Sequence, residues 1–251
     1  MYKSRIADGL LARKVAGKGA VLIEGPKWCG KTTTASRLAK SILDLGDSVV
    51  LKNSQTMFEI DPYILLEGDT PRQIDEWQTI PKLWDTIRSA VDKRGKMSQF
   101  ILTGSAVTPE SDETVHSGTG RYGRLRMRPM SLFESGESNG SVSLGDLFDG
   151  KTIDVQKNTL SISDIAFLTC RGGWPVATML DGEIALDQAI DYFDSVVDED
   201  IKRVDGVKRD SQRARRLLRS FARNISGQVS YATYKADMAS NDSDTLDEDT
   251  V

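Results

Sequence analysis

The sequence predicts an α/β fold, in which a parallel sheet is flanked by helices and followed by a smaller helical region. Short apolar runs alternate with segments of helical spacing over the first half of the chain, as in successive βα units. A glycine-rich loop separates the first apolar run from the helical segment after it. Beyond a stretch rich in Gly and Ser at residues 135–150, the apolar residues follow a helical period.

Five predicted strands account for the sheet. Four of them are apolar or alternating runs short enough for a strand, and the one at 72–76 is only weakly apolar. The helical segments between them favour parallel strands joined by right-handed crossovers. The run at residues 124–128 alternates so that its arginines share one face. The predicted strands are residues 20–24, 48–51, 72–76, 99–103 and 124–128.

Predicted helices lie before and between these strands. Glycines end several of them, and Pro81 stands in the first turn of the clearest one. The predicted helices of the first half are residues 4–16, 33–45, 56–66 and 81–94. Apolar faces predict two further helices, at residues 186–201 and 214–225.

The chain is predicted to divide near the stretch rich in Gly and Ser. Its 251 residues suffice for one large domain or two modest ones, and 39% of them are hydrophobic, enough for at least one core. We expect an α/β domain at residues 1–140, a helical region at 141–236 and a disordered acidic tail at 237–251. The net charge of −4 is unevenly placed, with a basic stretch at residues 202–223.

The two cysteines, Cys29 and Cys170, form neither a disulfide framework nor a set of metal ligands, which favours a reduced, intracellular protein. The amino-terminal residues are too polar for a signal peptide. No run approaches the roughly 18 apolar residues that a membrane span needs. The expected location is therefore the cytoplasm, with no membrane contact.

The glycine-rich loop has the spacing of a nucleotide-binding loop, because it fits G-x-x-x-x-G-K-[ST] without a mismatch. Glycines let the backbone turn so that successive N–H groups point at phosphate oxygens, and the following helix adds the positive end of its dipole. The pattern, lying between a strand and a helix, predicts a polyphosphate site. Its residues are Gly25, Pro26, Lys27, Trp28, Cys29, Gly30, Lys31 and Thr32.

Individual side chains at this loop have predicted roles. Lys31 would bridge the β- and γ-phosphates, and the Thr32 hydroxyl would be a ligand of Mg²⁺. Thr33 would reach the α-phosphate. We expect Trp28 to pack against the sheet edge rather than to shield the phosphates. We expect Cys29 to be a small residue tolerated in the loop rather than a redox-sensitive thiol.

Asp75 and Glu76 supply the acidic groups that a nucleotide hydrolase needs. Neighbouring side chains of a strand point opposite ways, but at the end of a strand the second one can swing into the site. Asp75 would hold Mg²⁺ directly or through water, and Glu76 would polarise the attacking water. If the strand at 99–103 lies beside the loop strand, Thr103 or Ser105 would sense the γ-phosphate, although both are also ordinary capping and turn residues.

A later loop offers an arginine for the transition state. Arg121 would act as a finger on the γ-phosphate in its own or a neighbouring subunit. His116, the only histidine, has no partners for a triad or a metal site and is expected to be solvated. Two interpretations stay open for the strand arginines, a nucleotide or subunit contact and a solvated face. These residues are Arg124, Arg126 and Arg128.

The helical region carries opposite charges on successive segments. One interpretation is a salt-dependent contact with nucleic-acid phosphates. Pairing of the two segments, or solvation, is favoured because complementary charge is close by. The acidic residues are Asp187, Asp191, Asp194 and Asp198, and the basic ones are Arg209, Arg213, Arg216 and Arg223.

Taken together, these features resemble the prokaryotic AAA-type ATP-binding proteins, in which an ATPase domain precedes a C-terminal domain of unknown function. The resemblance rests on GPKWCGKTTTA, PRQIDEWQTIPKLWDTIR, FILTGSA and HSGTGRYGRLRMRPMSLFESG, and it continues through CRGGWP and DEDIKRVDGVKRD. It implies a RecA/AAA-like P-loop NTPase core of five strands. ATP would bind at Gly30, Lys31 and Thr32, while Asp75 and Glu76 would serve the metal and the water.

This resemblance includes one departure. Members of the family stay similar to one another beyond the point that corresponds to Val251, in a region often compared with restriction-endonuclease folds. The resemblance therefore implies that the chain lacks most of the C-terminal domain, and no nuclease-like activity is expected.

The predicted function is that of a Mg²⁺-dependent ATPase that uses hydrolysis to switch conformation or assembly. A nucleotide-binding scaffold with little turnover is the alternative, which the missing distal region keeps open. A P-loop kinase is disfavoured, because it needs an acceptor pocket and an arginine-bearing lid in place of the Asp75-Glu76 pair. The expected ligands are ATP and Mg²⁺, and the expected partner is a second copy of the chain or another protein.

Overall fold

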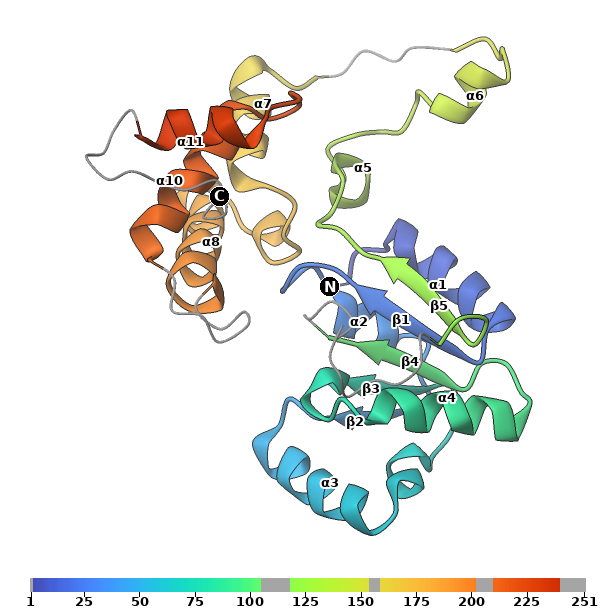
Figure 1. Cartoon of the computed structure of the whole chain (residues 1–251). Helices are drawn as coiled ribbons and strands as arrows, with labels where there is room; N and C mark the ends of the chain where they lie inside the picture. Colours follow the sequence, from blue (N-terminus) through green and yellow to red (C-terminus); the bar gives the residue numbers. More distant parts are fainter. Residues whose placement is uncertain (1, 105–117, 154–158, 202–209, 240–251) are drawn as a thin grey trace. The chain divides into compact units, whose positions relative to one another are not determined.

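The computed structural model describes residues 2–104, 118–153, 159–201 and 210–239. The chain folds as two compact units, Met1–Asp181 and Gly182–Val251. The first unit contains a five-stranded sheet with helices on both faces, and the second is helical (Figure 1). This arrangement confirms the predicted α/β fold with a helical region after it.

All five strands of the sheet are parallel, in the order β2-β3-β4-β1-β5. Parallel strands end at the same edge, so the residues that follow their carboxyl ends lie near one another. The strand register aligns Thr103 of β4 with Ile23 of β1 on one side and with Asp75 of β3 on the other. The strands are β1 (Ala20–Glu24), β2 (Ser41–Asp44), β3 (Arg72–Asp75), β4 (Phe100–Thr103) and β5 (Tyr122–Arg126).

Helices cover both faces of the sheet (Figure 1). The helices of the first unit as a whole are α1 (Ile6–Gly17), α2 (Lys31–Ser36), α3 (Ser48–Ile60), α4 (Leu83–Arg94), α5 (Leu132–Ser135), α6 (Leu144–Phe148) and α7 (Ile162–Arg171). Three 3₁₀ turns accompany them, η1 (Pro62–Leu66), η2 (Trp77–Thr79) and η3 (Ala177–Met179). Across the described ranges, none of the helices has the length and apolarity that crossing a membrane requires.

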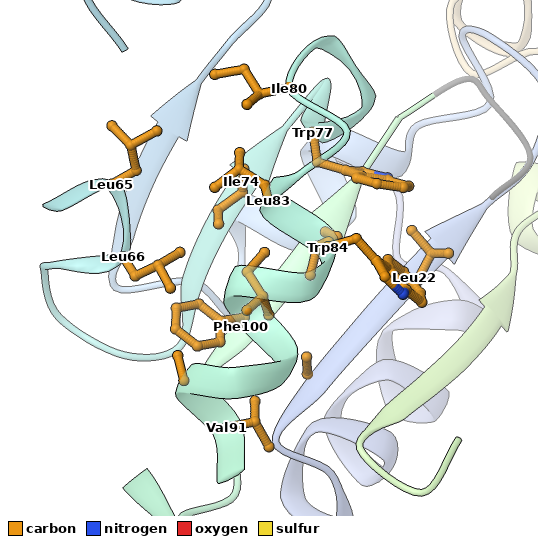
Figure 2. Packing of buried hydrophobic residues seen from close by; sticks show 14 of the residues in the cluster. Leu22, Leu65, Leu66, Ile74, Trp77, Ile80, Leu83, Trp84, Val91 and Phe100 are labelled. Carbon is orange, nitrogen blue, oxygen red and sulfur yellow. The ribbon is translucent and has the colours of Figure 1, made fainter. Parts of the chain in front are cut away.

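The central strands β1 and β4 are buried on both faces, which explains why their sequences read as continuous apolar runs. On one face, Leu22 and Phe100 pack with the buried side of α4, as Figure 2 shows. On the other face, Val21 and Ile23 pack against α1. Alternate residues of β1 therefore enter two separate cores, and both cores hold the strand that leads into the glycine-rich loop.

The segment from residue 33 to 60 corrects the sequence prediction. The predicted helix at 33–45 is wrong, because α2 ends at Ser36 and β2 occupies Ser41–Asp44. The predicted strand at 48–51 is also wrong, because α3 begins at Ser48. The Asp47 carboxylate caps this helix by accepting hydrogen bonds from the Val49 and Val50 N–H groups. Capping of the helix end outweighs the strand preference of the two valines.

The single helix predicted at 56–66 is also wrong, because α3 ends at Ile60 and the 3₁₀ turn η1 occupies Pro62–Leu66. Two other helices of the first unit follow the prediction closely. The helices predicted at 4–16 and 81–94 appear as α1 and α4, and Gly95 ends α4 in the left-handed conformation. The last strand begins two residues earlier than predicted and exposes Arg124 and Arg126 on its alternate face. Its buried residue Tyr122 stacks on Trp84 with ring centroids 3.9 Å apart.

The second unit consists of α8 (Gly182–Ser195), the π-helical turn η4 (Val196–Asp200), α10 (Ser211–Arg223) and α11 (Tyr231–Ala239). The guanidinium of Arg215 on α10 bonds to Asp194 at 2.6 Å and to Asp198 at 2.7 Å. The acidic and basic segments therefore pair, but through Arg215, which lies between the predicted residues Arg213 and Arg216. Asp237, predicted to lie in the tail, belongs to α11 and pairs with Arg223, while residues 240–251 lie outside the described residues.

Candidate functional site

The glycine-rich loop joins β1 to α2 at the carboxyl edge of the sheet. Gly25 and Gly30 have φ angles of +153° and +99°, which residues with a Cβ rarely adopt. A Cβ on Gly25 would also lie 2.2 Å from the Met127 carbonyl oxygen. The backbone therefore requires glycine at both positions, and at Gly25 the loop lies close against the residue that follows β5.

Lys31 folds back over this loop. Its Nζ donates to the carbonyl oxygens of Gly25 at 2.9 Å and Pro26 at 2.7 Å, which accounts for two of its three N–H donors. The pKa of Lys31 lies below its ordinary value, because burial lowers it by more than the nearby Cys29, Glu76 and Asp75 groups raise it. A buried ammonium among carbonyls and carboxylates is suited to a stronger anionic partner such as a phosphate.

Thr32, Asp75 and Thr103 meet where β3 and β4 end. The Thr32 hydroxyl donates to Asp75 Oδ1 at 3.2 Å, and the Thr103 hydroxyl donates to the same carboxylate oxygen. Gln73 extends this series of hydrogen bonds, because its Nε2 donates to Thr103 Oγ1 at 3.4 Å. Asp75 and Thr103 are buried, so the carboxylate is fixed before any ligand arrives.

The Thr32–Asp75 oxygen pair fits Mg²⁺. Adjacent ligands of an octahedral ion with bonds of about 2.0–2.1 Å lie about 2.9 Å apart, close to the 3.2 Å between these two oxygens. The described residues hold no cluster of three or more Cys, His, Asp or Glu side chains that would bind a metal by themselves. Mg²⁺ takes few protein ligands and completes its shell with phosphate and water oxygens.

Glu76 leaves the strand pattern immediately after Asp75. Its φ of +49° places it in the left-handed region and starts the turn η2. Its Cγ lies near Gly46, where an added Cβ would be 3.6 Å away. Gln78, two residues on, donates from Nε2 to Glu76 Oε2. No sequence pattern indicated Gln78, because its contact with Glu76 depends on the turn that Glu76 makes.

The remaining loop residues differ in exposure. Trp28 is 64% exposed, so the expectation that it packs against the sheet edge is wrong. Cys29 is fully buried, and burial raises the pKa of its thiol, as suits a small residue that fills space in the loop. Pro26, Lys27 and Thr33 have exposed side chains at this edge of the sheet.

Arg121 is not brought to the loop. Its carbonyl accepts from the Ala20 N–H, so it lies at the amino ends of β1 and β5, opposite the edge that carries Lys31. There its guanidinium bonds to Asp92 at 2.9 Å. A finger role within its own chain is incompatible with this position, and only a role toward a neighbouring subunit stays open. Ser105 and His116 lie outside the described residues.

Arg5 holds the loop from behind, a contact that the sequence did not indicate. It is buried and donates to the carbonyls of Cys29 at 2.8 Å and Arg128 at 2.7 Å. Its Nε bonds to the Glu134 carboxylate at 3.0 Å. Lys3 makes a similar link to the carbonyls of Ser135 and Thr178, both at 2.9 Å. The segment before α1 therefore joins the loop to the chain beyond β5.

Glu134→Gln is expected to lower the free energy of unfolding by about 1.5–3 kcal/mol at neutral pH, the usual contribution of hydrogen bonds to a charged group. Burial acts to raise the pKa of Glu134, but the Ser131 and Ile6 N–H groups and Arg5 outweigh it, so the net pKa lies below 4.5. The ionised form therefore stabilises the fold above about pH 4.5, and this contribution disappears as pH falls through the folded-state pKa.

Urea unfolding of wild type and Glu134→Gln at several pH values tests this. The difference between them should shrink in acid, whereas Glu59→Gln, at an exposed position, should change little at any pH. A difference that stays constant between pH 7 and pH 4 would contradict the assignment.

A pocket of about 310 Å³ opens beside the loop. Thr33 and Gly30 form its wall on the phosphate side, and Val176 and Met179, each about half exposed, form much of the apolar wall. Its lining residues are Tyr2, Lys3, Arg5, Gly30, Thr33, Thr34, Met130, Pro175, Val176 and Met179. All of them belong to the first compact unit.

Two family models match the chain. Residues 17–135 match the AAA domain, and residues 162–249 match a domain of unknown function (DUF8612). The first match covers the sheet and the loop, while the second begins at α7 and continues through the helical unit.

The chain is also similar to individual proteins. It is 27% identical over 139 residues to uncharacterized proteins of Mycobacterium bovis and Mycobacterium tuberculosis, a match that covers 55% of this chain and 31% of each relative. The solved structure of the Walker-type ATPase of Pyrococcus abyssi superposes with a TM-score of 0.53. That match has 15% identity and covers 99% of this chain and 87% of that one, so it bears on the fold.

Proposed function

We propose that this chain, which belongs to the P-loop proteins that carry an AAA domain followed by a domain of unknown function, binds ATP with Mg²⁺ and hydrolyses it. The observation that carries the proposal is the meeting of Thr32 and Asp75, whose oxygens lie 3.2 Å apart although 43 residues separate them. Hydrolysis would drive a conformational or assembly switch. The matched region is 31% of the length of the mycobacterial relatives, so what those whole proteins do is not carried over to this chain.

Each proposed role follows from the position of a side chain. Lys31 would exchange its carbonyl partners for β- and γ-phosphate oxygens. Thr32 and Asp75 would hold Mg²⁺, which when bound neutralises charge on those phosphates. Glu76 would accept a proton from the attacking water. The loop amides would bind the remaining phosphate oxygens.

Release of inorganic phosphate by the purified chain tests the proposal. Turnover that requires both ATP and Mg²⁺ is the expected result. Tight ATP binding without turnover would favour the alternative, a nucleotide-binding scaffold, and absence of binding would exclude both. Measuring the rate over a range of chain concentrations tests in addition whether a neighbouring copy contributes, as an Arg121 finger would require.

The pocket beside Thr33 is proposed to hold the nucleoside. Thr33 follows the two residues assigned to the outer phosphates and the metal, so a chain of phosphates running along the loop would deliver the ribose and base to this side. Burying an apolar group of side-chain size contributes about 1.5–3 kcal/mol, so ATP should bind on the order of 10- to 100-fold tighter than inorganic tripolyphosphate.

Val176→Glu is expected to remove most of this preference by placing a charge on the apolar wall. ATP affinity should fall toward that of tripolyphosphate, while the affinity for tripolyphosphate stays near its wild-type value. Titration calorimetry with both ligands measures the ratio. Ile60→Glu, at an exposed apolar position on α3, serves as the control. An unchanged ratio in Val176→Glu would place the nucleoside elsewhere.

A further inference from the structure

We infer that Gln78 is the positioning residue for Glu76, and that residue 104 is a glycine because the Gln78 side chain occupies the space beside it. The inference rests on the proposed function, since it concerns the group that accepts the proton of the attacking water. It adds a residue pair that neither the loop pattern nor the carboxylate pair contains.

The Gln78 amide lies between Glu76 and the end of β4. Its Nε2 donates to Glu76 Oε2, which fixes a carboxylate that has already left the strand pattern. Its Oε1 is buried, and within the described part of the chain it has no hydrogen-bond partner. A buried acceptor without a partner is unfavourable, so Oε1 does not hold the amide in this place. The hydrogen bond from Nε2 to Glu76 and the packing around the side chain hold it instead.

Gly104 forms the other side of this contact. A Cβ on Gly104 would lie 2.0 Å from Gln78 Oε1 and 2.9 Å from Cδ, so alanine at this position would displace the amide. The φ of Gly104 is not in the left-handed range, so space and not backbone conformation accounts for the glycine. Gly104 directly follows Thr103, whose hydroxyl bonds to Asp75. Gln78 therefore links Glu76, the proposed base, to the end of β4, where Thr103 contacts the proposed metal ligand Asp75.

The reaction requires this fixed carboxylate. The water oxygen forms a bond to the γ-phosphorus while the bond from phosphorus to the bridging oxygen breaks, and its electron pair stays on ADP. One water proton passes to Glu76 and from there to the phosphate product or solvent, and the other remains on the phosphate. A carboxylate free to rotate would meet the water less often in the required geometry, and a misplacement of about 1 Å costs up to about 10²-fold in rate.

The test uses three variants of the full chain. Gln78→Ala is expected to lower kcat on the order of 10- to 100-fold while the Kd for ATP stays unchanged. Gly104→Ala should do the same without altering Gln78 itself. The double variant should be no slower than the slower single variant, because both changes remove one interaction. Gly9→Ala, where an added Cβ meets nothing within 4 Å, is the control.

A second measurement does not depend on turnover. ADP with aluminium fluoride mimics the transferring phosphoryl group, and its retention relative to ATP should fall in Gln78→Ala and Gly104→Ala by a factor similar to the fall in kcat. Unchanged or raised kcat in Gln78→Ala, with wild type active, would overturn the inference and leave the ATPase proposal standing. Wild type that binds ATP but neither turns it over nor retains the mimic would overturn both.

Discussion

Lys31→Ala is expected to weaken ATP binding on the order of 10²- to 10³-fold, and with it all turnover. The Lys31 ammonium is buried and already surrounded by oxygen atoms, so it contributes a charge at a site from which water is largely excluded. Removing one partner of a buried, hydrogen-bonded charge pair costs about 2–5 kcal/mol of binding free energy. Titration with ATP and Mg²⁺ measures the effect.

The matched control for this variant is Lys40→Ala, which removes the same charge from an exposed position. Its Kd for ATP should stay within about threefold of wild type, since exposed charges contribute little. Binding by Lys31→Ala as tight as that of the control would mean that the loop is not the phosphate site, and the proposed function would fall with it.

Glu76→Gln is expected to lower kcat by about 10²- to 10⁴-fold, because an amide has the shape of the carboxylate but does not take up the proton of the water. The Kd for ATP should stay nearly unchanged, since Glu76 is assigned to the water and not to the phosphates. Stopped-flow phosphate release gives kcat, and titration of the same preparation gives the Kd.

Glu67→Gln provides the comparison, because it makes the same chemical change at an exposed position after η1. A Glu76→Gln enzyme with wild-type kcat would identify another group as the base. Loss of binding together with turnover would instead assign Glu76 to the ligand or to the metal.

The sequence predicted those parts of the site that depend on short stretches of chain. The loop between Gly25 and Thr32 is defined by its own spacing, and an apolar strand precedes it as the pattern requires. The adjacent carboxylates at the end of β3 were likewise found from neighbouring residues. The parallel sheet was predicted because helical segments alternate with the strands, of which β1 and β4 are buried on both faces and therefore read as unbroken apolar runs.

What the sequence could not predict depends on contacts between distant segments. The strand β2 lies at the sheet edge with Ile42 half exposed, so its sequence lacks the apolar run of a central strand. The valines after Asp47 favour a strand locally, yet the helix cap decides the outcome. Arg5 reaches Arg128 and Glu134 across more than 120 residues of sequence, and Gln78 depends on a backbone turn that no sequence pattern indicates.

The anchoring of Lys3 and Arg5 bears on how this protein should be dissected. A fragment cut to the matched AAA region would begin after both side chains and stop before Thr178, leaving the carbonyls of Cys29 and Arg128 without their donor. Such a fragment would keep every residue of the glycine-rich loop but lose the Arg5 side chain, which donates to the loop at the Cys29 carbonyl. Expression boundaries should therefore follow the compact unit, which extends to Asp181, rather than the stretch that sequence similarity delimits.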